Sequence, residues 1–257
     1  MSDPSHILWL YAHPMPTSLN AAVRDEVISR LPDRSWRTEV VDLYAEGWNP
    51  LLSHEDVAAA SGRTLSDRQR AATLSGSPPD AVRTQQERVM RAQLIVVQFP
   101  LWWYGMPAIL KGWFDRVFTN GFAFGVRDEN GRVRKYGDGN LAGRRLLPVV
   151  TAGDRETALR DRGISGDIDD ILWPLLHGTA HYTGMTPLRT HLIAEADSIS
   201  ENRVETEVGR LHDRITGASR ERPLGFRSLR GGDYGQDHTL HDHVAPTTTG
   251  HRAHTRF

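Results

Sequence analysis

Apolar and polar positions alternate in blocks along most of this chain. Five short runs are rich in apolar and β-branched residues, which is typical of strands buried in a parallel sheet. Between them, apolar side chains recur every three or four residues, as they do on one face of a helix. Strands that alternate with helices predict an α/β domain, a doubly wound five-stranded parallel sheet with helices on both faces. The expected strands are residues 7–12, 38–43, 94–98, 146–151 and 188–194.

Four helices are expected from the apolar spacing. One of them begins at Pro107, where the first turn of a helix tolerates proline, and another contains Pro174 and should be broken or kinked there. The connection of residues 44–80 is polar and long for a simple crossover. The apolar positions of the four helices are Val23, Val27 and Leu31; Ile109, Leu110, Trp113, Phe114 and Val117; Ile168, Ile171, Leu172, Leu175 and Leu176; and Val204, Val208, Leu211 and Ile215.

The C-terminal residues have a different character. From Arg222 onward the chain is rich in Gly, Asp, His and Thr and has no apolar periodicity. Such a composition is typical of a segment that is disordered or that wraps over another surface. We therefore expect one domain over residues 1–218 and an irregular arm over residues 219–257.

Composition excludes several classes of function. The net charge of −1 over 257 residues gives no global field that would favour nucleic acid or an anionic membrane. There are no cysteines, which excludes disulfides, thiolate metal sites and cysteine nucleophiles. No apolar run approaches the ~20 residues that a membrane helix needs. Because the chain enters its first strand almost at once, without a basic leader, we expect a cytoplasmic protein.

The loop after the third expected strand carries three consecutive aromatic residues, Trp102, Trp103 and Tyr104. Doubly wound proteins bind their ligands at the carboxyl ends of parallel strands, and this loop lies at such an end. Exposed rings there are costly unless a flat molecule stacks on them. Periodicity alone also permits the three rings to be part of the core, so both interpretations stay open at this point.

The loop after the first expected strand reads His13-Pro14-Met15-Pro16-Thr17-Ser18-Leu19-Asn20 and leads into a helix. Backbone N–H groups and hydroxyls at a helix N-terminus form an anion site by geometry. Thr17, Ser18 and Asn20 are also ordinary N-capping residues, and capping alone would explain two of them. The sequence has no G-x-G-x-x-G fingerprint here, which disfavours a classical dinucleotide-binding fold.

Two further features have a functional and a structural interpretation. His177 and His181 are four residues apart, as zinc ligands on a helix are, but no third ligand lies at a recognisable spacing. We interpret both as core or surface histidines and expect no metal. Thr151-Ala152-Gly153-Asp154 follows the fourth expected strand and is a simple turn unless it contacts a ligand.

The run from Phe99 to Trp113, Phe-Pro-Leu-Trp-Trp-Tyr-Gly-Met-Pro-Ala-Ile-Leu-Lys-Gly-Trp, resembles the flavin-dependent NAD(P)H:quinone reductases of the DT-diaphorase type, a flavodoxin-like family. That family carries Phe-Pro-Leu-x-Trp-Phe-Gly-x-Pro-Ala-x-Leu-Lys-Gly-Trp at this position. The runs 163–167 and 171–174 are similar to its Gly-Ile-His-Gly-Asp and Ile-Leu-Trp-Pro. The motifs in residues 225–234 also resemble a tail of bacterial relatives. The resemblance implies a flavodoxin-like fold and a homodimer, with the arm partly ordered and packed on the partner.

The resemblance also implies which residues contact the ligands. FAD is favoured over FMN as the cofactor, and NAD(P)H is the co-substrate. The implied cofactor-binding residues are His13, Thr17, Ser18, Leu19, Asn20, Pro100, Leu101, Trp102, Trp103, Tyr104, Thr151, Ala152, Gly153, Asp154 and Arg203. The implied substrate-binding residues are Trp103, Tyr104, Phe124, Gly153 and Tyr182. For Arg203 the alternative is a solvated surface charge.

This chain departs from the family where charge on the reduced flavin is stabilised. A Tyr and a His of the family fall on Leu159 and Ser165, and its Thr-Thr-Gly-Gly turn reads Thr-Ala-Gly-Asp at residues 151–154. Anionic reduced flavin needs nearby dipoles or cations. With no certain catalytic side chain, we take Arg155 as the first candidate for that role.

The function that these motifs predict is two-electron, ping-pong reduction of quinones or similar flat aromatic acceptors by NAD(P)H. An alternative is a regulatory flavoprotein, similar to the quinone-reductase-like ancillary subunits of ion transport systems. An electron carrier of the flavodoxin type is disfavoured, because those proteins are smaller and strongly acidic. Neither nucleic acid nor a membrane is expected as a partner.

Overall fold

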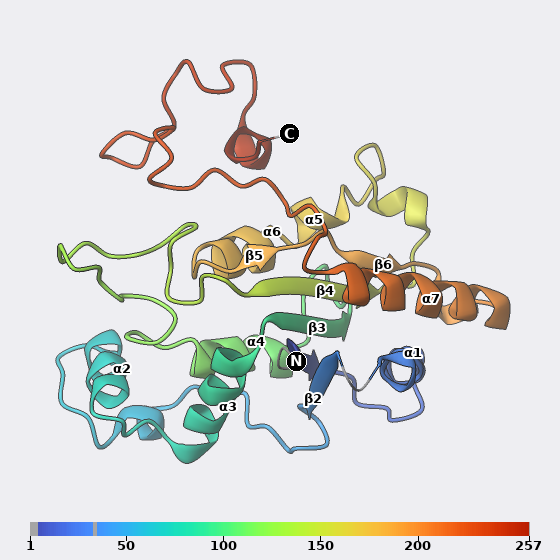
Figure 1. Ribbon diagram of the computed structural model, residues 1–257, viewed down its shortest axis with the longest axis horizontal. Coiled ribbons are helices and arrows are strands. Elements are labelled where there is room, and N and C mark those ends of the chain that lie inside the picture. The colour runs from blue at the N-terminus through green and yellow to red at the C-terminus, as the bar shows by residue number, and fades with distance from the viewer. Residues whose placement is uncertain (1–4, 33–34, 257) are drawn as a thin grey trace.

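A parallel β-sheet forms the centre of the computed structural model, which describes residues 5–32 and 35–256 (Figure 1). The strand order is β2-β1-β3-β4-β5, and β6 also pairs with β4. Such an order, with β1 beside β3, is that of a doubly wound sheet and confirms the predicted α/β class. The strands are β1 (Ser5–Tyr11), β2 (Trp36–Asp42), β3 (Leu94–Pro100), β4 (Arg145–Thr151), β5 (Thr186–Pro187) and β6 (His191–Ile193).

Of the last predicted strand, residues 188–194, only His191–Ile193 forms a strand, β6, and the short strand β5 lies just before the predicted range. Leu188 still donates its backbone N–H to the carbonyl of Leu146, at 2.8 Å. The N–H of Thr190 instead donates to the carboxylate of Asp169, at 2.9 Å, and so leaves the ladder. A contact with a side chain 21 residues away therefore interrupts a strand that the local pattern predicts as continuous.

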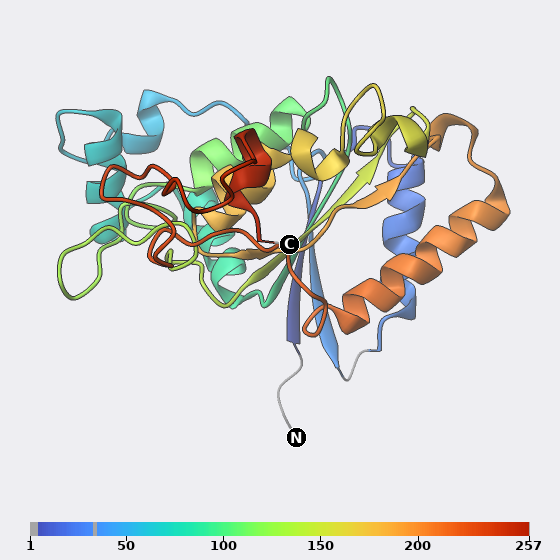
Figure 2. The same cartoon turned by 90° about the horizontal axis from the view of Figure 1, so that it is seen from above.

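Helices cover both faces of the sheet (Figure 2). On one face, α1 (Leu19–Arg30) and α7 (Glu201–Gly217) pack on the side chains of Ile7, Trp9 and Tyr11. On the other face, α3 (Asp80–Arg91) and α4 (Ala108–Val117) pack on Leu8, Leu10 and Val97. Burial of apolar side chains against both faces stabilises the sheet, as the apolar strands predict.

Two helices lie where the sequence predicts none. Helix α2 (Leu65–Leu74) begins with a capping box in which Thr64 and Asp67 bond each other's backbone N–H. The buried face of α3 includes Gln85 and Gln86, whose amides bond Trp113 Nε1 and the carbonyl of Val117. Because these polar side chains find buried partners on α4, the face is not apolar enough to be recognised from periodicity.

The predicted break at Pro174 is confirmed. The helical stretch consists of α5 (Ile168–Ile171), α6 (Trp173–Leu175) and a turn of π-helix over Leu176–His181. Proline lacks the backbone N–H that a continuous helix would need at this position. No helix of the described residues combines the length and the apolarity that a bilayer crossing requires.

The C-terminal arm lies beside α5 and α6 in both views (Figures 1 and 2). Phe226 of the arm contacts the rings of Trp173 and His177 edge-on, at 5.3 and 5.1 Å between centroids. The ring of His251, in a short 3₁₀ turn, stacks on Trp173 with 4.2 Å between centroids. Aromatic contacts thus attach the arm to its own domain, and its expected contact with a partner subunit stays a prediction.

Candidate functional site

The loop after β1 presents a helix N-terminus. Ser18 is the N-cap of α1: its hydroxyl accepts a hydrogen bond from Ala21 N at 3.2 Å and bonds the Tyr11 hydroxyl at 3.1 Å. The backbone N–H groups of Leu19 and Asn20 lie in the first helical turn, where no intrahelical acceptor exists. His13 is half-buried and Thr17 is exposed. Ser18 therefore has the capping role, while the Leu19 and Asn20 N–H groups remain donors for an anion.

Asn20 connects this loop to two other strands. The side-chain amide nitrogen of Asn20 donates to Thr151 Oγ1 at 2.8 Å. Its backbone carbonyl accepts a hydrogen bond from Gln98 Nε2, also at 2.8 Å. Gln98 in turn accepts from Trp9 Nε1. These buried bonds fix the carboxyl ends of β1, β3 and β4 relative to one another. Asn20 Oδ1 is buried without a hydrogen-bond partner among the described residues, so an acceptor is left at the site.

The three aromatic residues after β3 form a strained, exposed turn. Trp102 and Gly105 exchange two backbone hydrogen bonds of 3.0 Å, and Trp103 and Tyr104 between them have φ angles of 51° and 57°. A two-residue turn of this kind normally carries Asn-Gly, because bulky side chains at positive φ cost about 1 kcal/mol or more each. Trp103 is 98% exposed, Tyr104 56% and Trp102 42%. The rings are not part of the core, which decides the question that periodicity left open.

The loop after β4 lies against the aromatic turn. Leu101 N donates to the carbonyl of Thr151 at 2.8 Å, directly after Pro100 at the end of β3. Thr151 and Ala152 are buried, whereas Gly153 and Asp154 are exposed. The three loops that the sequence singled out, residues 13–20, 100–104 and 151–154, thus meet along one edge of the sheet.

The two departures from the family pattern differ in their surroundings. Leu159 is 1% exposed and packs inside, so it offers nothing polar to a ligand. Ser165 lies near the surface, and its hydroxyl bonds the Tyr104 hydroxyl at 3.1 Å. Arg155 is exposed, and no ion pair is formed by its guanidinium among the described residues. It remains available to a negative charge beside the loop.

Three of the implied ligand residues lie further from these loops. Arg203 donates to Glu195 at 2.8 Å, and Glu195 N donates to the carbonyl of Asp154, so Arg203 is one residue removed from the β4 loop. Tyr182 packs edge-on against Tyr136, with 5.0 Å between centroids, and burial raises the pKa of its hydroxyl. Phe124 is half-buried after α4. The roles of these residues stay predictions.

His177 and His181 belong to an aromatic cluster. The ring of His177 stacks on Trp173 at 4.3 Å, and His181 Nε2 bonds the carbonyl of Arg227 at 3.1 Å. Burial, together with repulsion from His181, lowers the pKa of His177 to about 3. In the described part of the chain, no group of three His, Asp or Glu side chains is arranged to hold a metal ion. The contacts of both histidines are those of core residues.

Acid is expected to destabilise the fold through His177 and His191. Burial lowers the pKa of each to about 3, whereas the unfolded value is about 6.5. The unfolded state therefore binds protons that the native state does not, and stability falls as the pH drops from about 6.5 towards 3. Each such proton lowers the free energy of unfolding by up to about 1.4 kcal/mol per pH unit. The loss is smaller for His177 than for His191, because His177 is partly hydrated.

Urea unfolding at pH 7 and pH 5 would measure this loss. His191→Gln and His177→Gln should each reduce the pH dependence of the free energy of unfolding, and His191→Gln should reduce it more strongly. Burial raises the pKa values of Asp169 and Glu207, which therefore act in the opposite direction, but both carboxyls are present in the parent and in each variant, so the comparison among these proteins isolates the histidines. Identical slopes in the variants and the parent would contradict the assignment.

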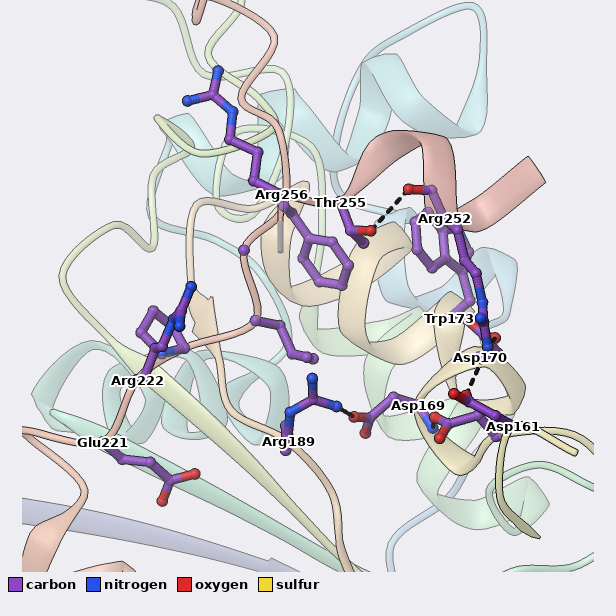
Figure 3. A pocket seen from close by; sticks show the side chains of 15 residues that line it. Asp161, Asp169, Asp170, Trp173, Arg189, Glu221, Arg222, Arg252, Thr255 and Arg256 are labelled. Carbon is purple, nitrogen blue, oxygen red and sulfur yellow. Dashed lines mark hydrogen bonds and ion pairs between the residues drawn. The ribbon is translucent and has the colours of Figure 1, made fainter. Parts of the chain in front are cut away.

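A cavity of about 620 Å³ lies elsewhere, between the arm and α5 (Figure 3). Charged side chains line much of it, and most pair with a neighbour. Arg189 bonds Asp169 at 3.2 Å, and Arg252 bonds Asp161 at 2.6 Å. Because its charges largely neutralise one another, this cavity offers no defined ligand chemistry, and the candidate site remains at the three loops.

Comparison with known proteins agrees with this geometry. A family model described as flavodoxin-like fold matches residues 5–215. The chain belongs to the flavodoxin-like fold family. Within it, the ribosyldihydronicotinamide dehydrogenase-like protein traD of Penicillium crustosum is 32% identical, over 97% of this chain and 95% of that protein. The human ribosyldihydronicotinamide dehydrogenase [quinone] is 31% identical, over 85% and 94%.

A solved structure extends the similarity to the whole chain. A Klebsiella pneumoniae protein assigned as a quinone reductase superposes with a TM-score of 0.92 at 33% identity. The match covers 98% of this chain and 100% of that one. The similarity therefore includes the C-terminal arm as well as the sheet and its helices.

Proposed function

We propose that the protein is a flavin-dependent oxidoreductase that transfers electrons from NAD(P)H to quinones or similar flat aromatic acceptors. The exposed turn of Trp102, Trp103 and Tyr104 carries this proposal. It lies at the carboxyl edge of a doubly wound sheet, where such folds bind ligands, and its strained backbone is typical of a functional segment. The relatives named above are dehydrogenases and reductases.

The residues at the three loops fit a flavin nucleotide. Its phosphates would accept from the backbone N–H groups of Leu19 and Asn20 and from the hydroxyl of Thr17, at the positive end of α1. The unpartnered Asn20 Oδ1 would accept a hydrogen bond from the ligand. The ring system would lie between the aromatic turn and residues 151–154. FAD is favoured over FMN by the family resemblance, which also implies that Arg203 would contact the adenosine part.

A bound flavin would supply the redox chemistry, because it accepts a hydride from NAD(P)H and passes the electron pair to the acceptor. The overall reaction, NAD(P)H + quinone + H⁺ → NAD(P)⁺ + hydroquinone, balances with one proton from solvent. The chain itself supplies orientation. Trp103 and Tyr104 offer flat faces for stacking, while Arg155 offers a positive charge to the reduced state.

The exposed aromatic surface supports the proposed homodimer, with Phe124 and Tyr182 closing the acceptor site at the interface. Domain boundaries at 1–218 and 219–257 and a cytoplasmic location stay predictions. The regulatory alternative has no support, since the relatives are named as enzymes and no feature of the chain indicates a transporter as partner.

Purified protein is expected to be yellow and to oxidise NAD(P)H when a quinone is added. Heat release followed by chromatography identifies the cofactor as FAD or FMN, and a panel of quinones measured with NADH and with NADPH defines the substrates. Colourless protein that neither FAD nor FMN reconstitutes would contradict the proposed function.

A further inference from the structure

Three polar side chains meet beside the aromatic turn, and each stands where the family pattern has a different residue. The Tyr104 hydroxyl lies 3.1 Å from Ser165 Oγ, which donates to Asp154 Oδ2 at 3.4 Å. The family motifs have Phe, His and Gly at these positions. The three residues come from the loops after β3, before α5 and after β4, so the contact depends on tertiary structure.

The direction of these hydrogen bonds follows from elementary chemistry. An ionised carboxylate only accepts, and a serine hydroxyl carries a single proton. Because Ser165 donates its proton to Asp154, Tyr104 must be the donor in the hydrogen bond between Tyr104 and Ser165. The Tyr104 hydroxyl therefore donates its proton to Ser165, and the oxygen of this exposed side chain keeps its lone pairs, with which it can accept a hydrogen bond.

The network holds its members in place. Arg155 N donates to Asp154 Oδ1 at 2.7 Å and so fixes the second carboxylate oxygen. Tyr104 is held by its hydroxyl at one end and by the closed Trp102–Gly105 turn at the other. Its neighbour Trp103 is almost fully exposed, which places a free stacking face beside an oriented acceptor.

We propose that Tyr104 determines substrate specificity by accepting a hydrogen bond from an N–H donor on the edge of a flat ring bound at the aromatic turn. This inference rests on the proposed function. Two ligands provide such chemistry: the carboxamide of a nicotinamide, and an amino-substituted quinone. A site built around an acceptor discriminates against an analogue that lacks the donor.

Matched ligand pairs, in which a methyl replaces the amino group, test the proposal. For the nicotinamide, NAD⁺ is compared with 3-acetylpyridine adenine dinucleotide by calorimetric titration of the flavin-loaded protein. For the acceptor, 2-amino-1,4-naphthoquinone is compared with 2-methyl-1,4-naphthoquinone by kcat/KM. In at least one pair, Tyr104→Phe should weaken the amino ligand about five- to tenfold and the methyl ligand less than twofold, the size of one hydrogen bond.

Variants of Ser165 test the direction of the hydrogen bond between Tyr104 and Ser165. Ser165→Ala frees the Tyr104 proton and should reduce the preference for the amino ligand, whereas Ser165→Thr keeps the hydroxyl and should retain it. Thermal unfolding of all variants checks that the fold is unchanged. Equal losses for both members of both pairs would overturn the role of Tyr104 alone. Failure of the parent protein to bind or reduce any of the four ligands would overturn the proposed function and, with it, this inference.

Discussion

Replacing Gly112 with alanine is expected to destabilise the protein by about 3 kcal/mol or more. Gly112 lies in α4, where the helix crosses the chain at Pro50. A Cβ at this position would overlap the carbonyl oxygen and Cβ of Pro50 and would lie 2.6 Å from its Cα. Because these are largely backbone atoms, no rotamer change relieves the clash.

Gly209→Ala is the matched control. Gly209 lies inside α7, and a Cβ there would have nothing within 4 Å. Alanine should therefore raise stability by up to about 1 kcal/mol through helix propensity alone. Urea unfolding of both variants measures the difference, and a Gly112→Ala variant as stable as the parent would contradict the observed packing of α4.

Introducing a negative charge at Thr17 is expected to weaken flavin binding at least about tenfold. Thr17 is exposed in the loop before α1, so glutamate there fits without disturbing the core. At ~6 Å in a water-like dielectric, one charge repels another by about 0.7 kcal/mol, and a pyrophosphate carries two. The loss should shrink in high salt, because exposed charges are screened.

Thr17→Gln serves as the control, because glutamine has the same size as glutamate and carries no charge. Equilibrium titration of the apoprotein with FAD, followed by fluorescence quenching, gives both dissociation constants. Equal affinities in the two variants would place the phosphates away from this loop while leaving the aromatic turn as a candidate ring site.

The alternating pattern of the sequence determined the architecture. Strands β1, β3 and β4 lie close to their predicted ranges, because a strand buried on both faces must be apolar at nearly every position. The edge strand β2 is less apolar, with only Val41 buried, and it begins two residues before its predicted range. The break at Pro174 follows from the missing N–H of proline, which is equally local. The order of the strands was left open by this pattern, because right-handed crossovers reduce the number of possible arrangements without selecting one of them.

The sequence also identified the three loops of the candidate site, because ligand loops follow parallel strands in this class of fold. Their detailed chemistry was less accessible. Spacing did not separate the capping role of Ser18 from a phosphate-binding role, and it left the aromatic rings with two interpretations. Each of those questions concerns what a side chain touches across the fold.

Only the tertiary structure decided the remaining features. Helix α3 escaped prediction because its buried glutamines are satisfied by α4, and the strand at residues 188–194 is interrupted by Asp169. The link from Tyr104 through Ser165 to Asp154 joins residues up to 61 positions apart. The local pattern of apolar and polar residues indicates which side of each segment is buried and which is exposed. These other features depend instead on which distant polar groups become neighbours once the chain is folded.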